Sequence, residues 1–115
     1  MCADIDRRVL FEEDRINTYY VDQTRLSSFH ELSANLPNGL FDLVIDDGLH
    51  SPNANIATML FALTILKPSG FFVVEDISLS SIPVWQVIAA LLPEGYRPKI
   101  IQAKAALLFM VQKPE

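Results

Sequence analysis

Two short apolar segments of this sequence each end in residues that could bind a ligand or carry out acid–base chemistry. The segment 41–45 runs into Asp-Asp-Gly-Leu-His at 46–50, and the segment 71–74 runs into Glu-Asp at 75–76. Short apolar runs bounded by turn-forming residues are typical of buried parallel strands. Ligands bind at the carboxyl ends of the strands in open α/β sheets. We therefore expect these acids and the histidine to converge at one edge of a sheet.

This convergence of carboxylates has an electrostatic consequence. Like charges held close together are unfavourable unless a cation lies among them or some of the groups remain protonated. A divalent metal held by oxygen ligands would relieve the repulsion. The alternative interpretation is that these acids are helix N-caps and solvated loop residues, since acids at strand ends also occur without a ligand.

The composition is that of a small acidic protein. The chain has 115 residues, 50% of them hydrophobic, and we expect one domain spanning 1–115. A net charge of -5 and scattered basic residues make nucleic acid a poor partner. The single cysteine, Cys2, excludes an internal disulfide and fits a reducing compartment. The sequence shows no signal-peptide pattern and no apolar run near the roughly 18 residues that span a bilayer. We therefore expect a cytoplasmic protein without a membrane partner.

Hydrophobic periodicity and turn residues predict alternating strands and helices. In the first half, a strand ends at 3–6, and a loop or single helical turn follows at 7–15. β-Branched and aromatic residues predict a strand at 17–21. Apolar residues at helical spacing predict a helix at 26–36, which the turn at 37–39 ends.

The second half continues the alternation. It predicts, in order, a strand at 41–46, a helix that opens at 51–52 and runs to 66, a turn at 67–70, a strand at 71–75, a helix at 84–92 and two strands at 99–102 and 106–111. Strand–helix–strand alternation implies a mostly parallel sheet with helices on its faces. The predicted fold class is α/β, closed by a C-terminal antiparallel strand pair.

The order and spacing of these elements resemble those of the class I S-adenosylmethionine-dependent methyltransferases along essentially the whole chain. Ala-Asp-Ile-Asp at 3–6 resembles the acidic end of that family's second strand, and Tyr-Val-Asp-Gln at 20–23 resembles the end of its third. Leu-Lys-Pro-Ser-Gly at 66–70 resembles the turn before its fifth strand, with Ser69 replacing a glycine. The resemblance implies a partial Rossmann-like, doubly wound sheet.

The acidic motifs carry a more specific resemblance. Asp-Asp-Gly-x-His at 46–50, together with Glu-Asp at 75–76, is similar to the metal-dependent sugar and macrolide O-methyltransferases and the related cephalosporin-hydroxylase-like proteins. The family's first strand and its Gly-rich turn, which wraps the methionine portion of the cofactor, have no counterpart, and no Gly-x-Gly occurs. Because that strand normally lies at the centre of the sheet, we expect a fragment, a truncated gene product or one piece of a larger assembly.

The resemblance implies S-adenosylmethionine as the cofactor. Asp4 would accept hydrogen bonds from the two ribose hydroxyls, with Asp6 as the neighbouring alternative. Asp22 and Gln23 would flank the adenine, where an acceptor can take a hydrogen bond from the exocyclic amine. The alternative interpretation makes Asp4 and Asp6 loosely held terminal acids and Asp22 a turn residue.

The resemblance also implies Mg²⁺ or another divalent cation, held by Asp46 or Asp47 together with Glu75 and Asp76. Adjacent strand residues point to opposite faces, so we expect only one of Asp46 and Asp47 to be a ligand. The other would cap the next segment or contact the cofactor. The ion would hold the vicinal hydroxyls of the acceptor and lower the pKa of the one that attacks. His50 would be the general base, unless it is a solvent-facing loop residue.

These residues suggest three kinds of function. The first is in-line methyl transfer to a hydroxyl of a small sugar or polyol. The second is a non-catalytic, truncated domain that serves as an interaction module, for which we expect a homo-oligomer formed through an exposed sheet edge. The third is a phospho-accepting receiver domain, which fits poorly because the acid pair at 46–47 lies too far along the chain.

Overall fold

The computed structural model describes residues 1–9, 12–13 and 16–115. No helix in these ranges has the length and apolar character needed to cross a bilayer. The elements are, in chain order, β1 (Cys2–Asp4), η1 (Arg7–Val9), β2 (Glu12–Glu13), β3 (Ile16–Tyr20), α1 (Leu26–Ser33), β4 (Phe41–Asp46), α2 (Pro52–Ile65), β5 (Leu66–Val74), η2 (Leu79–Ser81), α3 (Ile82–Leu91), β6 (Arg97–Gln102) and β7 (Leu107–Gln112).

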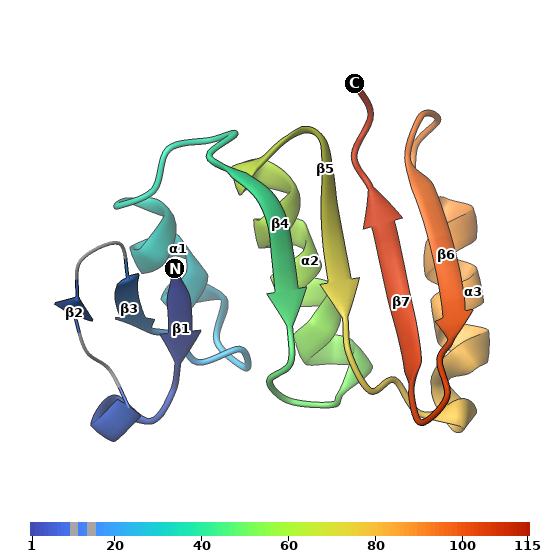
Figure 1. Ribbon diagram of the computed structural model, residues 1–115, viewed down its shortest axis with the longest axis horizontal. Coiled ribbons are helices and arrows are strands. Elements are labelled where there is room, and N and C mark those ends of the chain that lie inside the picture. Colours follow the sequence, from blue (N-terminus) through green and yellow to red (C-terminus); the bar gives the residue numbers. More distant parts are fainter. Residues whose placement is uncertain (10–11, 14–15) are drawn as a thin grey trace.

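The N-terminal strands form a small sheet of their own in the order β1-β3-β2 (Figure 1). β1 runs parallel to β3, and the backbone N–H of Val21 donates to the carbonyl of Asp4 at 3.0 Å beyond the last pair. A small core of Val21, Phe29 and Leu32 joins this sheet to α1. The ring of Phe29 also packs against Phe61 of α2, with centroids 5.2 Å apart. The N-terminal unit is thereby attached to the rest of the molecule.

The C-terminal strands form a second sheet in the order β4-β5-β7-β6. β4 and β5 are parallel, whereas β7 is antiparallel to both β5 and β6. The main core lies between this sheet and the helices α2 and α3. Trp85 of α3 is fully buried there and packs on Phe109 of β7 at a centroid distance of 4.5 Å. Alternate residues of β5 and β7 supply the sheet side of this core, because every second side chain of a strand points to the same face, and Met59 and Ala62 of α2 pack against them.

The structure confirms the predicted α/β class, the predicted order of strands and helices and the antiparallel C-terminal pair. The predicted loop or turn at 7–15 falls partly on residues 10–11 and 14–15, outside the described residues; within the rest, η1 and β2 occupy it. The predicted helix at 26–36 is shorter, since α1 ends at Ser33, well before the Pro37 turn.

The predicted turn at 67–70 was wrong in one respect, because β5 already begins at Leu66. Leu66 pairs with Phe41, and the register then shifts before Leu43 pairs with Phe71. The C-terminal backbone holds this irregular stretch in place: the N–H of Lys113 donates to the carbonyl of Gly70 at 2.9 Å. The turn-forming residues 67–70 therefore belong to the start of β5, because hydrogen bonds to the distant C-terminal segment hold them there.

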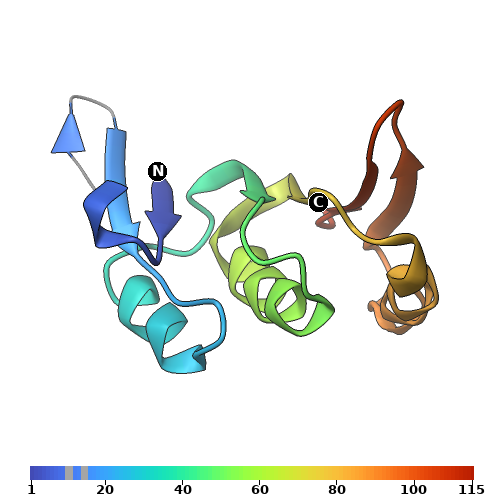
Figure 2. The same cartoon turned by 90° about the horizontal axis from the view of Figure 1, so that it is seen from below.

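Two features differ from a complete doubly wound sheet. Among the described residues, α1, α2 and α3 all lie on one face of the strands, which Figure 2 shows from below. In addition, no strand pairing joins β1 to β4 in the described part of the chain, so the two sheets stay separate. A cavity of about 760 Å³ occupies the space beside both strands and is lined by residues of β1, β4, α1 and α2.

Candidate functional site

The carboxyl ends of β4 and β5 bring the acidic motifs together. The two strands run parallel, and the backbone N–H of Glu75 donates to the carbonyl of Asp46 at 3.0 Å, which aligns the two ends. The residues that follow, Asp47 and Asp76, then lie near His50, and one ligand atom from each of these three side chains lies within 4.8 Å of the others. All three side chains are exposed. They form a group that could hold a metal ion, which we call the Asp47–His50–Asp76 cluster.

The backbone of Asp76 is in an uncommon conformation. Its φ is 55°, in the left-handed region that non-glycine residues seldom occupy. Asp and Asn are the non-glycine residues that tolerate this region best. The chain therefore bends directly after β5 at the residue whose carboxylate joins the cluster. Strain of this kind is often found at functional sites.

The structure separates the two members of each acid pair. Asp47 and Asp76 belong to the cluster, whereas the predicted ligands Asp46 and Glu75 do not. Asp46 is only 4% exposed and uses both carboxylate oxygens within the protein. Glu75 is half-buried beside the last residue of β5. The alternation of side chains along a strand explains why neighbouring acids point to different surroundings.

Asp46 lies at the centre of a buried polar network. Its carboxylate accepts hydrogen bonds from Gln23 Nε2 at 3.0 and 3.1 Å, from the N–H of Gly48 at 3.1 Å and from Asn55 Nδ2 at 2.9 Å. Gln23 Nε2 also donates to Thr58 Oγ1 at 2.7 Å. These residues come from the loop after β3, from the end of β4 and from α2. The network therefore ties three segments of the chain together at this point.

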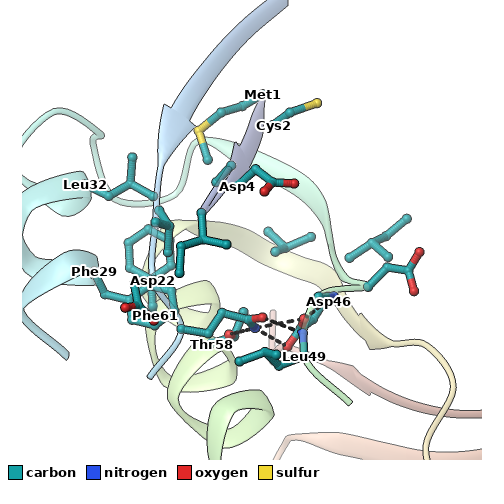
Figure 3. Close-up of a pocket in the computed structure, with 18 of the residues that line it drawn as sticks. Met1, Cys2, Asp4, Asp22, Phe29, Leu32, Asp46, Leu49, Thr58 and Phe61 are labelled. Carbon is teal, nitrogen blue, oxygen red and sulfur yellow. Dashed lines mark hydrogen bonds between the residues drawn. The ribbon is translucent and has the colours of Figure 1, made fainter. Parts of the chain in front are cut away.

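The cavity beside this network is lined by two more of the predicted acids. Figure 3 shows Asp46, Leu49 and Thr58 at one end of it, and Met1, Cys2 and Asp4 at the other. Asp4, at the end of β1, and Asp22 both line the cavity. Apolar side chains of β4, α1 and α2 line much of the rest, including Phe29, Leu32, Leu43, Ile45 and Phe61. A cavity of about 760 Å³ with a few polar groups is of the size that small-molecule ligands use.

Local hydrogen bonds lower the pKa of two acids in the N-terminal part of the chain, Asp22 and Asp6. Asp22 Oδ1 accepts from the backbone N–H and the hydroxyl of Thr24 at 3.0 and 2.6 Å, and these bonds lower the pKa of Asp22. Asp6 instead pairs with Arg8, whose guanidinium lies 2.9 Å away and lowers the pKa of Asp6. Asp6 does not line the cavity, whereas Asp4 does. The geometry thus favours Asp4 over Asp6 as a residue that could contact a ligand in the cavity.

Sequence reasoning missed Asn55 and Thr58, which are both buried on α2. A signal for them existed, because they are polar residues three positions apart in a helix that is otherwise mostly apolar. Residues at this spacing lie on the same side of a helix. Gln23 was noticed, but its partners could not be found from the sequence, since Asp46 and Thr58 lie 23 and 35 positions away.

Two curated relatives are similar to this chain in sequence. Demethylmacrocin O-methyltransferase of Streptomyces fradiae is 40% identical over 75 residues, which make up 64% of this chain and 18% of that protein. The 8-demethyl-8-alpha-L-rhamnosyl tetracenomycin-C 2'-O-methyltransferase of Streptomyces olivaceus is 36% identical over 85 residues, or 73% of this chain and 22% of that protein. The chain therefore spans about a fifth of the length of these relatives. No family model matches it.

Solved structures share the fold. The methyltransferase MycE of the mycinamycin biosynthetic pathway, in complex with Mg, S-adenosylhomocysteine (SAH) and mycinamycin VI, has a TM-score of 0.71 and 20% identity, covering 98% of this chain and 36% of that one. An rRNA methylase from Streptococcus thermophilus has a TM-score of 0.58 and 15% identity, covering 87% of this chain and 60% of that one. The shared fold is thus compatible with more than one kind of acceptor.

Proposed function

We propose that this chain, which belongs to the class I S-adenosylmethionine-dependent methyltransferases, is the acceptor-side part of a metal-assisted O-methyltransferase that acts on a hydroxyl of a small sugar or polyol. The observation that carries the proposal is the Asp47–His50–Asp76 cluster at the ends of β4 and β5, next to a cavity lined by Asp4 and Asp22. The Streptomyces relatives are O-methyltransferases, which supports this reaction over other methyl transfers.

The cavity fits S-adenosylmethionine in the polar groups that it presents. One oxygen of Asp4 accepts the N–H of Asp6 at 2.8 Å, which holds the carboxylate while its second oxygen remains available to a ribose hydroxyl. The Thr24 hydroxyl and backbone N–H lower the pKa of Asp22, whose carboxylate can accept a hydrogen bond from an exocyclic amine. The sequence contains no Gly-x-Gly for the methionine portion. We therefore expect the isolated chain to bind this cofactor weakly.

The cluster fits a divalent cation such as Mg²⁺. Asp47 and Asp76 offer carboxylate oxygens, which hard cations prefer, and their exposure leaves room for water and substrate oxygens. When bound, such an ion would stabilise an acceptor alkoxide and lower the pKa of the hydroxyl. The imidazole of His50 suits softer metals better than Mg²⁺, so we assign it to proton transfer.

The proposed reaction uses His50 as the general base. An unprotonated imidazole nitrogen accepts the proton of the acceptor hydroxyl as the oxygen attacks the sulfonium methyl. A new bond forms between the oxygen and the methyl carbon, the bond from sulfur to that carbon breaks, and its electron pair stays on sulfur. The acids at the ends of β4 and β5 orient the acceptor for this in-line attack.

Titration of SAH into the purified chain, with and without Mg²⁺, tests the proposal. We expect measurable binding that Asp4→Asn weakens by about 10- to 100-fold, since a hydrogen bond to a charged group is worth roughly 1.5–3 kcal/mol. Asp6→Asn is the matched control, because Asp6 faces Arg8 and not the cavity. A folded chain that binds neither SAH nor a divalent cation would exclude the proposed function.

A homo-oligomer is a second proposal, carried by the edges of β1 and β4 that pair with no other strand among the described residues. Unpaired strand edges favour pairing with another chain. Ile5, Leu43 and Ile45 near these edges line the mouth of the cavity and are each more than half exposed, at 57%, 51% and 51%. A second copy that pairs at this place would cover apolar side chains and satisfy backbone groups together. The proposed methyltransferase function also predicts that the acceptor is a small molecule and that the chain does not bind nucleic acid.

A further inference from the structure

We infer that Gln23 and Asp46 are positioning residues, whose hydrogen bonds hold the segment 46–50 so that Asp47 and His50 face Asp76. This inference rests on the proposed function, since it concerns the same cluster. It replaces the predicted roles of Gln23 and Asp46 as cofactor contacts and of Asp46 as a metal ligand. Neither residue then has to touch the metal, the cofactor or the substrate.

The first support is that the Asp46 carboxylate is already fully used. It is 4% exposed and accepts from the side chains of Gln23 and Asn55 and from the backbone of Gly48. A buried carboxylate needs such donors, because an unpaired charge in the interior is costly. The bond to Gly48 lies between Asp47 and His50 in the sequence and fixes the turn that carries both.

The second support is that the amide of Gln23 has only one orientation that fits. Its oxygen accepts the backbone N–H of Leu49 at 2.8 Å, while its nitrogen donates to Asp46 and to Thr58. Thr58 Oγ1 itself donates to the carbonyl of Ala54, so it is an acceptor towards Gln23. A flipped amide would place its oxygen against the carboxylate. Gln23 therefore forms hydrogen bonds with the segment 46–50 at two places, at the carboxylate of Asp46 and at the backbone N–H of Leu49.

The third support is the space around Gly48. A Cβ atom at this position would collide with Gln23 Oε1 and would lie 3.5 Å from Asp46 Oδ1. A glycine allows the backbone to approach the amide this closely. Gln23 keeps its present position only beside a glycine, because a larger residue at 48 would push the end of its side chain away from Leu49 and Asp46. Asn55 adds a last tie, as its Nδ2 also donates to the carbonyl of Leu49 at 3.1 Å.

A comparison of Gln23→Glu with Gln86→Glu tests the inference, with Mn²⁺ alone as the probe for the cluster. Both changes add one negative charge, but Gln86 is an exposed residue of α3. A negative charge near a cation site should by itself tighten Mn²⁺ binding. We expect the opposite for Gln23→Glu, a loss of roughly 10- to 100-fold, because residues that orient metal ligands have effects of this size. Gln86→Glu should bind as the unchanged chain does.

Amide exchange of the metal-free chain provides the second readout. The Leu49 amide should exchange faster in Gln23→Glu and in Gly48→Ala, while core amides of β5 and β7 stay protected. Gly48→Ala changes no charge, and it should weaken Mn²⁺ binding as well. Unchanged Leu49 exchange, or unchanged or tighter Mn²⁺ binding in folded Gln23→Glu, would overturn the inference. If the unchanged chain binds no Mn²⁺, the proposed function fails at this site, and the Leu49 amide still decides whether Gln23 holds the segment.

Discussion

At the scale of single residues, the site depends on which of two neighbouring acids points to the cluster. Asp76 combines a left-handed backbone with a carboxylate that lies near Asp47 and His50. Within each of the pairs 46–47 and 75–76, the sequence does not show which acid points to the cluster. In the structure, one member of each pair joins the cluster and the other does not.

Asp76→Asn separates the charge of this residue from its conformation. Asn tolerates the left-handed region as Asp does, so we expect a change in the free energy of unfolding below about 0.5 kcal/mol. The loss of one anionic ligand should weaken Mn²⁺ binding by about tenfold or more. Calorimetric titration with Mn²⁺ and urea unfolding measure the two effects. Glu94→Gln, on the exposed loop after α3, is the control, and equal Mn²⁺ binding in both variants would contradict the assignment.

Thr24→Val tests the electrostatics of Asp22. The Thr24 hydroxyl and N–H lower the pKa of Asp22, and the substitution removes the hydroxyl donor. We expect the pKa of Asp22 to rise towards its ordinary value, as followed by carboxyl NMR titration. Because the folded-state pKa lies below the unfolded one, the stabilisation is present above the unfolded value and is lost as the pH falls through the folded one. The variant and the unchanged chain should therefore differ in stability at neutral pH and converge in strong acid.

At the scale of elements, the alignment of β4 and β5 places the ends of both strands at the same level. Gly70 is important for this alignment. A Cβ there would lie 2.9 Å from the carbonyl oxygen of Lys67 and 3.1 Å from that of Asp42. Both are backbone atoms, so they cannot move aside as the end of a side chain could. The start of β5 must therefore keep a glycine to stay beside β4.

Gly70→Ala should destabilise the protein by about 1–3 kcal/mol, since overpacking forces the backbone to shift. Urea unfolding followed by circular dichroism measures the change. Gly39→Asn is the control: Gly39 has a φ of 64° with no atom near its Cβ position, and Asn tolerates that conformation. If Gly70→Ala costs no more than the control, the close approach of β5 to β4 is not a constraint.

At the scale of the whole molecule, the two sheets leave surface that a complete α/β sheet would cover. The helices lie on one face, and β1 and β4 each keep an unpaired edge in the described part of the chain. Apolar residues of β4 that point away from α2, such as Leu43 and Ile45, are half exposed. Exposed apolar patches of this kind mark either a ligand-binding groove or a surface that contacts another chain, and Leu43 and Ile45 also line the cavity.

Ile45→Lys tests association through these edges. Lysine on an edge strand opposes strand pairing, so the variant should be a monomer where the unchanged chain is a dimer. Size-exclusion chromatography with light scattering reports the mass of each. Leu91→Lys is the matched control, because Leu91 is 77% exposed at the end of α3, away from β4. An unchanged chain that remains a monomer at high concentration would exclude the homo-oligomer.

The sequence by itself determined the order of strands and helices, because hydrophobic periodicity, caps and turn residues are local signals. It also pointed to the segments 46–50 and 75–76, since acids that follow short apolar runs stand out in the sequence. The expected burial of both strands was right for much of β5 but wrong for β4, where Leu43 and Ile45 are half exposed. Only the tertiary structure decided which side chains meet. The bonds from Gln23 to Asp46 and to Thr58 join residues that are 23 and 35 positions apart in the sequence. Such choices depend on packing between elements, which no local pattern records.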